Sequence, residues 1–132
     1  MASEAFTLAE QFFSGAHGGD RNVAKAVLHP EAVIEPAGGC PFSGTYVGPN
    51  AVLELGAKID EGYTIVWSDE GLHDAGEFAV KRVTVTFTSK TNGRSATTRG
   101  MVIVWAKDGK IIRLDGFHKN SRLFDELVGD AP

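Results

Sequence analysis

The sequence predicts an α+β fold built on an antiparallel sheet. Three segments of the C-terminal half have the composition of β-strands, namely residues 77–90, 94–107 and 110–118. In the first of them, valine and phenylalanine alternate with threonine, which is the period-two pattern of a sheet with two different faces. An Asn-Gly pair and an Asp-Gly pair separate the segments, and such pairs favour tight hairpin turns. Because helical patterns precede this meander, helices and antiparallel strands are segregated along the chain.

Two helices are predicted ahead of the first strand. Apolar residues recur at helical spacing over residues 4–16, and Ser3 can cap this helix. Two glycines end it, and Asp20 can cap a shorter second helix over residues 21–29, which the following proline terminates.

The middle of the chain combines strands, a loop and a third helix. Residues 31–35 form a short predicted strand, which stops at a proline because proline cannot donate to a sheet ladder. Residues 36–48 are rich in glycine and proline and predict a loop. A third helix is expected at residues 51–62 and another strand at residues 63–68, with a turn at Gly71.

A last short helix is predicted at residues 122–128, with Asn120 or Ser121 as its cap and residues 129–132 as a frayed tail. The chain has 132 residues, a length that can bury a core without disulfides or metal. We therefore expect a single domain over residues 1–132.

Composition argues against several classes of protein. Hydrophobic residues make up 42% and charged residues 23%, and the longest apolar runs are too short to cross a bilayer, so no membrane association is expected. The net charge is −4 and the basic residues are scattered, which argues against nucleic acid as a partner. The N-terminus lacks the basic-then-apolar layout of a secretory signal, so we expect a cytoplasmic protein.

No cofactor is expected. The four histidines lack metal-ligand spacing, and Cys40, the single cysteine, excludes an intramolecular disulfide and a thiolate-based zinc site. The glycine pairs at residues 18–19 and 38–39 lack the strand-loop-helix context of a phosphate-binding loop. The prediction is therefore a protein that uses neither a metal ion nor a nucleotide-like cofactor.

Three segments in order resemble one known superfamily: residues 24–39 (AKAVLHPEAVIEPAGG), residues 41–52 (PFSGTYVGPNAV) and residues 102–118 (VIVWAKDGKIIRLDGFH). They are similar to the nuclear transport factor 2-like superfamily, and within it to the SnoaL-like polyketide cyclases and ketosteroid isomerases. The resemblance implies a cone-shaped, curved mixed sheet wrapped with the N-terminal helices around a pocket, and a homodimer formed through the outer surface of the sheet. The superfamily includes isomerases, cyclases, dehydratases, epoxide hydrolases and non-catalytic binding modules, and fold alone does not choose among them.

The resemblance also implies roles for individual residues. In ketosteroid isomerases the general base precedes the proline that ends the first strand, and this position is Glu35 here. The oxyanion-hole tyrosine of that group corresponds to Phe12 or Phe13, and its protonated acid to Gly100 or Met101. Both hydrogen-bond donors of that oxyanion hole are thus missing from this chain.

Two other groups of the superfamily point to further positions. Limonene epoxide hydrolases use an Arg-x-Asp pair where this chain has Arg99, Gly100 and Met101, so the arginine is retained and the acid is not. SnoaL-like cyclases place an aspartate near the end of the closing strand, where this chain offers Asp115 and His118.

His118, Glu35 and Arg99 are the candidate catalytic residues. Alternation from the last hairpin turn places His118 on the pocket side, and an imidazole with a pKa of about 6.5 can take and give protons at neutral pH. Glu35 could accept a proton at the opposite wall, and Arg99, if it points inward, could stabilise developing negative charge. The alternatives are that His118 only hydrogen-bonds a backbone carbonyl and that Glu35 is a solvated acid at a strand end.

Apolar and aromatic residues on the predicted inner faces are expected to line the pocket. These positions are Phe12, Val27, Tyr46, Tyr63, Val83, Val85, Phe87, Met101, Trp105 and Leu114. The convex side would then carry Val102, Val104 and Ile112 and form the homodimer interface. Two functions stay open: an enzyme that performs acid–base chemistry on a small hydrophobic molecule, such as an isomerase, cyclase or hydrolase, and a binding or dimerisation module without turnover.

Overall fold

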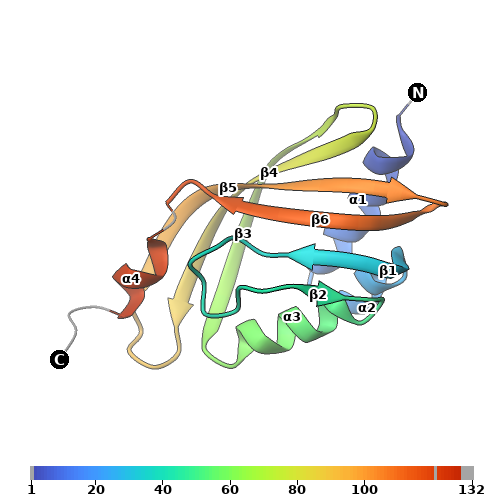
Figure 1. The fold of residues 1–132 in the computed structure, drawn as a ribbon. Helices are drawn as coiled ribbons and strands as arrows, with labels where there is room; N and C mark the ends of the chain where they lie inside the picture. The colour runs from blue at the N-terminus through green and yellow to red at the C-terminus, as the bar shows by residue number, and fades with distance from the viewer. Residues whose placement is uncertain (1, 121, 129–132) are drawn as a thin grey trace.

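The structure, a computed structural model, describes residues 2–120 and 122–128 (Figure 1). The proposed cap Ser121 and the tail at residues 129–132 lie outside the described residues. The helices of the described chain are α1 (Glu4–Ala16), α2 (Arg21–Lys25), α3 (Ala51–Asp60) and α4 (Leu123–Val128). Its strands are β1 (Leu28–Glu35), β2 (Tyr46–Val47), β3 (Tyr63–Asp74), β4 (Phe78–Ser89), β5 (Ser95–Lys107) and β6 (Lys110–His118).

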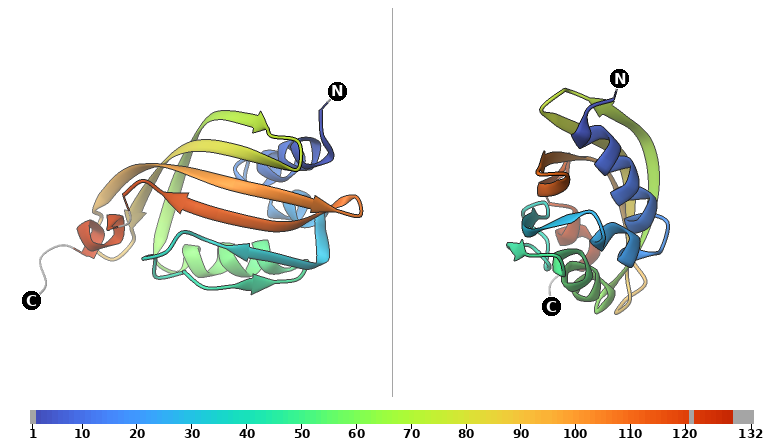
Figure 2. Two further views of the ribbon diagram at one scale, coloured as in Figure 1. Left: turned by 45° about the horizontal axis from the view of Figure 1, so that its top comes forward. Right: turned by 90° about the vertical axis from the view of Figure 1, so that its right-hand side faces the viewer.

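These strands form one mixed sheet. Within the described residues the strand order is β2-β1-β6-β5-β4-β3, and β1 runs parallel to β6 while the other neighbours are antiparallel. The sheet is strongly curved, and α1, α2 and α3 lie against its concave side (Figure 2). The predicted α+β class and the curved mixed sheet are therefore confirmed.

Three differences from the prediction concern how the strands are placed. α2 ends at Lys25 because Leu28, which is buried, joins β1 and pairs with Ile111 of β6. The short strand β2 forms where a loop was predicted. β3 continues past Gly71, where a turn was predicted, because a bulge between Asp69 and Gly71 absorbs the irregularity without ending the ladder.

In β5 the residues on the concave side are the opposite set from the predicted one. The sheet register pairs Val83 of β4 with Gly100, and paired residues point to the same face. Val83 is buried on the concave side, so Gly100 and Val104 face inward, and Val104 is completely buried. Arg99 and Trp105, which were expected in the pocket, therefore lie on the outer face of the sheet.

The outer face carries a different apolar set from the predicted interface. Val104 lies in the core and Val102 packs against it, so neither is an exposed interface residue. The large apolar residues exposed on this face include Met101, Phe117, Val66 and Val47, which are 43%, 49%, 67% and 58% exposed.

α4 closes the end of the sheet that lies farthest from the N-terminus (Figure 1). Leu123, Phe124 and Leu127 of α4 form one buried cluster with Val85 and Phe87 of β4. This helix therefore fills the far part of the concave face, and the space that remains open lies between the sheet and the first three helices.

Candidate functional site

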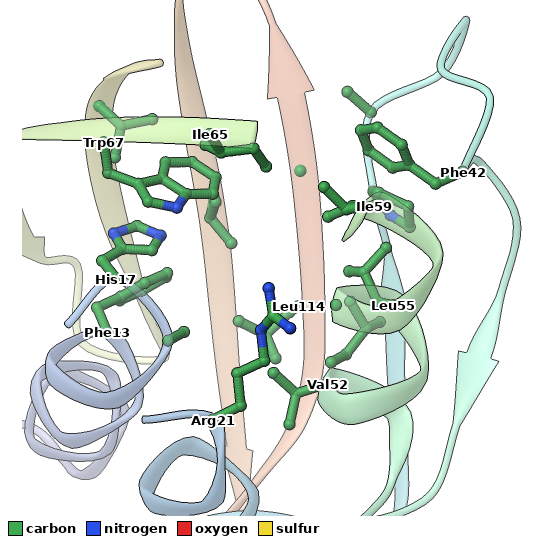
Figure 3. Close-up of a pocket in the computed structure, with 18 of the residues that line it drawn as sticks. Phe13, His17, Arg21, Phe42, Val52, Leu55, Ile59, Ile65, Trp67 and Leu114 are labelled. Atoms are coloured by element: carbon green, nitrogen blue, oxygen red, sulfur yellow. The ribbon is translucent and has the colours of Figure 1, made fainter. Parts of the chain in front are cut away.

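A cavity of about 670 Å³ lies between the concave face of the sheet and α1, α2 and α3. Figure 3 shows Trp67 and Phe13 on one wall and Leu55 and Ile59 of α3 on the other. Most side chains around this space are aliphatic or aromatic, so a bound molecule would meet mainly apolar surface.

Several of the predicted lining residues border this cavity. They are Phe12, Tyr63, Val83, Phe87, Met101 and Leu114. Met101 does so from a strand position whose side chain lies on the outer face. The remaining predicted residues lie elsewhere, and each for a separate reason.

Val85 is covered by α4 and is fully buried there. The Tyr46 hydroxyl donates to the carbonyl of Phe42 at 2.8 Å, which ties β2 to the loop before it. Trp105 packs on the outer face against the ring of Phe78, with 6.1 Å between the ring centroids. Val27 packs against the main core between α2 and β1 and does not border the cavity.

His118 borders the cavity from the last position of β6. Its ring lies 5.6 Å from the ring of Phe87, and Gly100 is its partner in the neighbouring strand. A Cβ on residue 100 would lie 2.6 Å from the carbonyl oxygen of Phe117 and 3.3 Å from the His118 ring, so a glycine is needed here. Burial lowers the pKa of His118, and the imidazole is therefore neutral at pH 7 and able to accept a proton.

The Glu35 carboxylate lies on the other face of the sheet. Its Oε1 accepts a hydrogen bond from Arg113 Nη2 at 2.8 Å, and Arg113 Nε lies 3.0 Å from Asp115 Oδ1. Glu35 pairs with Asp115 in the sheet register, whereas the preceding residue, Ile34, faces the core together with Leu114. The structure therefore does not bring the Glu35 carboxylate and the His118 imidazole together, although Glu35 is among the residues that border the cavity.

Arg99 also lies away from the cavity. Its side chain is 64% exposed on the outer face, and its Nε lies 3.8 Å from Glu70 Oε2. It borders a shallower depression on that face, together with Arg82 and Lys119. The cause is the reversed face of β5: the register that puts Gly100 inside puts Arg99 outside.

The structure brings together a polar cluster that the sequence interpretation missed. His17 follows the last turn of α1, and its Nδ1 lies 3.0 Å from Asp69 Oδ1 of β3. Lys81 of β4 reaches the same carboxylate, with 3.3 Å between its Nζ and Asp69 Oδ2. The His17 imidazole stacks on the indole of Trp67, with 4.0 Å between centroids and 13° between planes (Figure 3).

One signal for this cluster was present in the sequence. Lys81 lies in the buried alternation of β4, between Ala79 and Val83, where an apolar residue is expected. A buried lysine requires a charged partner. The identity of that partner, Asp69, depends on the pairing of β3 with β4 and has no local signal.

Electrostatics within the cluster favour a neutral imidazole beside an ionised carboxylate. Burial lowers the pKa of His17, and the hydrogen bond and charge of Asp69 oppose this shift without cancelling it. Burial disfavours the charged form of Asp69, but His17 and Lys81 together hold the pKa of this carboxyl below its ordinary value. At pH 7, Asp69 is therefore ionised and accepts the Nδ1 proton of a neutral His17.

The mouth of the cavity carries an ion pair between two helices. Arg21 of α2 donates from Nη1 and Nη2 to the two carboxylate oxygens of Asp60 in α3, at 2.8 and 3.2 Å. The guanidinium lies directly over Gly56, where a Cβ would come within 2.4 Å of Arg21 Cζ. Figure 3 shows Arg21 reaching from the helix toward the cavity.

Three further observations bear on metal sites, on the reactivity of Cys40 and on membranes. Among the described residues, no three histidine, cysteine or carboxylate side chains gather to form a metal site. Cys40 is buried, and this burial raises the pKa of its thiol to about 11. No helix in residues 2–120 and 122–128 is long and apolar enough to cross a membrane.

A comparison with known protein families identifies the family of this chain. The model of the SnoaL-like domain matches residues 9–114. The chain belongs to the SnoaL-like domain family. A comparison with curated protein sequences finds no significant match.

Solved structures resemble this SnoaL-like domain over almost its whole length. A nuclear transport factor 2-like protein from Burkholderia thailandensis has a TM-score of 0.89 at 18% identity, covering 98% of this chain and 100% of its own. TerC, co-crystallised with polyporic acid, has a TM-score of 0.81 at 18% identity, covering 97% and 100%. A protein from a Jannaschia species, assigned as a SnoaL-like polyketide cyclase, has a TM-score of 0.79 at 14% identity, covering 98% and 95%. At these identities the similarity shows the nuclear transport factor 2-like fold alone.

Proposed function

We propose that this SnoaL-like protein is an enzyme without a cofactor that binds a small, mainly apolar molecule in the cavity and moves protons on it. The observation that carries the proposal is the presence of two part-buried imidazoles, His17 and His118, in the wall of an otherwise mainly apolar space. Burial lowers the pKa of both, so both are neutral proton acceptors at pH 7. Such a site suits isomerisation, cyclisation or hydrolysis that begins with removal of a proton.

The ligand is held by shape and by aromatic contact. Phe12, Tyr63 and Phe87 offer ring surfaces around the cavity, and Leu114 of β6 contributes an aliphatic side chain to the sheet wall. A planar or cyclic molecule of low charge fits such a lining. Glu35 and Arg99, which the sequence suggested as catalytic residues, face away from this space and receive no role in the proton transfer.

The similar structures support the choice of test compounds. TerC was crystallised with polyporic acid, and the Jannaschia protein is assigned as a polyketide cyclase. A panel of polyketide-like, steroid and terpenoid compounds therefore covers the proposed class. The thermal midpoint of the protein should rise with at least one of these compounds, because ligand binding to the folded state stabilises it.

A variant identifies the binding site. Leu114→Arg places a charge in the sheet wall of the cavity and should abolish the thermal shift, whereas Val66→Arg, on the exposed outer face, should leave it unchanged. Stabilisation by nucleotides or metal ions alone would contradict the proposal. Compounds that bind without being converted at any pH from 5 to 9 would favour the second candidate function, a binding module without turnover.

We further propose that the protein forms a homodimer through the outer face of the sheet. The exposed side chains of Met101 and Phe117 support this interface, since large apolar groups on a sheet face are normally covered by a partner. Sedimentation velocity should show a dimer at micromolar concentration, and Phe117→Asp should shift it to monomer. A wild-type monomer at that concentration would contradict the proposal.

A further inference from the structure

We propose that His17 is the catalytic base of the cavity and that Asp69 and Lys81 are its positioning residues. This inference rests on the proposed function and assigns its proton acceptor. It starts from His17 at the end of α1, which borders a mainly apolar space and contacts Asp69 of β3, the carboxylate that also pairs with Lys81 of β4.

The geometry fixes the orientation of the imidazole. Nδ1 of His17 is held at 3.0 Å by Asp69, and the ring lies between the indole of Trp67 at 4.0 Å and the ring of Phe13 at 4.9 Å. Only 8% of the side chain is exposed. With one nitrogen bound and both ring faces covered, Nε2 is the atom that a molecule in the cavity can reach (Figure 3).

The end of α1 explains how the sequence positions His17 at the cavity wall. The backbone N–H of His17 donates to the carbonyl of Phe13 and completes the last turn of α1. A Cβ on Gly18 would lie 2.2 Å from the carbonyl oxygen of Ser14, so only glycine allows the chain to leave the helix here. Gly19 follows with a φ of 91°, which turns the backbone away and leaves the imidazole at the cavity wall.

A purely structural role explains the cluster poorly. The Lys81–Asp69 ion pair is weak evidence for stability, because the buried Lys81 loses its hydration while the Asp69 side chain, 42% exposed, keeps contact with solvent that screens the attraction. An aliphatic residue at position 81 would continue the buried alternation of β4 at lower cost. A functional role explains the cluster better: an ionised Asp69 holds His17 in the tautomer that carries its proton on Nδ1.

The surrounding groups tune the base in opposite directions. Asp69 on β3 favours protonation of His17, and Lys81 on β4 disfavours it. α1 contributes the uncharged ring of Phe13, and α2 contributes Arg21, whose charge is bound by Asp60. Trp67 stabilises the imidazolium once it forms, because a cation is attracted to the face of an indole.

The proposed step balances within one ligand molecule. A C–H bond next to a ligand carbonyl breaks, its proton forms an N–H bond at His17 Nε2, and the electron pair moves into the ligand as an enolate. The imidazolium then returns the proton to a carbon or oxygen of the same ligand. No oxidant, reductant or second substrate is required, so the ligand class is a mainly apolar ketone with an acidic C–H bond.

The first test requires no ligand. Nitrogen-15 NMR of the full-length protein should show neutral His17 with its proton on Nδ1 and a bare Nε2. Asp69→Asn should lower the pKa of His17, whereas Lys81→Met should raise it, because each variant removes one of the opposing charges. A neutral His17 with its proton on Nε2, or shifts of the same sign in both variants, would overturn the assignment.

The second test measures proton removal directly. The probe is 2-tetralone, a small apolar ketone, in D₂O, with deuterium incorporation at its α-carbon followed by proton NMR. His17→Gln should lower the catalysed exchange rate by roughly a hundredfold or more with little change in KM. Asp69→Asn should move the pH profile of exchange to lower pH, and Lys81→Met should move it to higher pH. His118→Gln tests the other cavity imidazole, and Val66→Gln, on the exposed outer face, is the control that should leave the exchange rate unchanged.

The outcomes separate this inference from the function on which it rests. Exchange that survives in His17→Gln but is lost in His118→Gln would overturn the assignment and leave the enzyme proposal standing. Absence of binding and exchange in the wild-type protein would count against the enzyme proposal. The tautomer of His17 measured by NMR would then be the remaining test of the His17–Asp69 contact. Circular dichroism of each variant excludes unfolding as the cause of a loss.

Discussion

The two part-buried histidines predict that this protein loses stability when the pH falls below neutral. Burial lowers the pKa of His17 and of His118 in the folded state, whereas the unfolded chain titrates near 6.5. Between these values the unfolded state binds more protons than the folded state, so the free energy of unfolding rises with pH. The stability that the two groups provide is therefore fully present well above pH 6.5 and is lost as the pH falls toward their folded pKa values.

The slope of the free energy of unfolding against pH is limited by the number of protons that the unfolded state binds in excess of the folded state. Each histidine that is neutral when folded and protonated when unfolded contributes at most about 1.4 kcal/mol per pH unit. The aspartates do not add to this slope near pH 6: the pKa values of Asp60 and Asp69 are lowered from 3.8, so their contribution is lost only in more acidic solution. We therefore expect a fall of at most about 1.4 kcal/mol per pH unit for each buried histidine between pH 6.5 and 5.5.

Urea unfolding at pH 7.5, 6.5 and 5.5, followed by tryptophan fluorescence, measures this slope. His118→Gln should reduce the pH dependence, and the double variant with His17→Gln should remove most of it. A wild-type free energy of unfolding that stays constant or rises from pH 7.5 to 5.5 would refute the reasoning, because it would mean that neither histidine is held neutral by the fold.

Three smaller predictions follow from single contacts. Gly100→Ala should lower the free energy of unfolding by about 1–3 kcal/mol in urea titrations, because the added Cβ would meet the Phe117 carbonyl oxygen at 2.6 Å; an unchanged midpoint would contradict this. Gly56→Ala gains about 1 kcal/mol of helix propensity but displaces the Arg21 guanidinium, so it should stabilise an Arg21→Ala background more than the wild type in a double-mutant cycle. Cys40, with a thiol pKa of about 11, has a thiolate fraction of about one in a thousand at pH 8 and should react with a disulfide reagent only slowly until urea unfolds the protein.

The alternation of apolar and polar residues predicted most of the fold, but it did not decide which face of β5 points into the core. In β4 the inner residues are apolar except for Lys81 and Ser89, and half of the outer ones are threonine, so alternation identifies the buried face. β5 offers an apolar set on both faces, with Val102 and Val104 on one and Ile103 and Trp105 on the other. Period-two alternation cannot choose between two such sets. The close approach of β5 to β6 decides which set is buried, because only Gly100 fits against the backbone of β6 at that position.

The candidate site was predictable only where it depends on alternation within a single strand. Alternation from the last hairpin turn placed Leu114 and His118 on one face of β6, and both border the cavity. His17 was not found, because its partner Asp69 lies 52 residues away and the contact depends on how α1 lies across the sheet. The bulge in β3 adds to the difficulty, since residues after Asp69 change face relative to a regular strand.

The division of charge between the two faces of the sheet constrains the chemistry. The ion pairs of Glu35 with Arg113 and of Glu70 with Arg99 lie on the outer face, whereas the concave side carries the Lys81–Asp69 pair and presents His17 and His118 to the cavity. A ligand that gives its proton to His17 becomes an anion beside an imidazolium in a space of low dielectric, where opposite charges attract strongly. The pair therefore stays together until the proton returns. Such a site favours the movement of a proton from one atom of a molecule to another over the release of an ionised product.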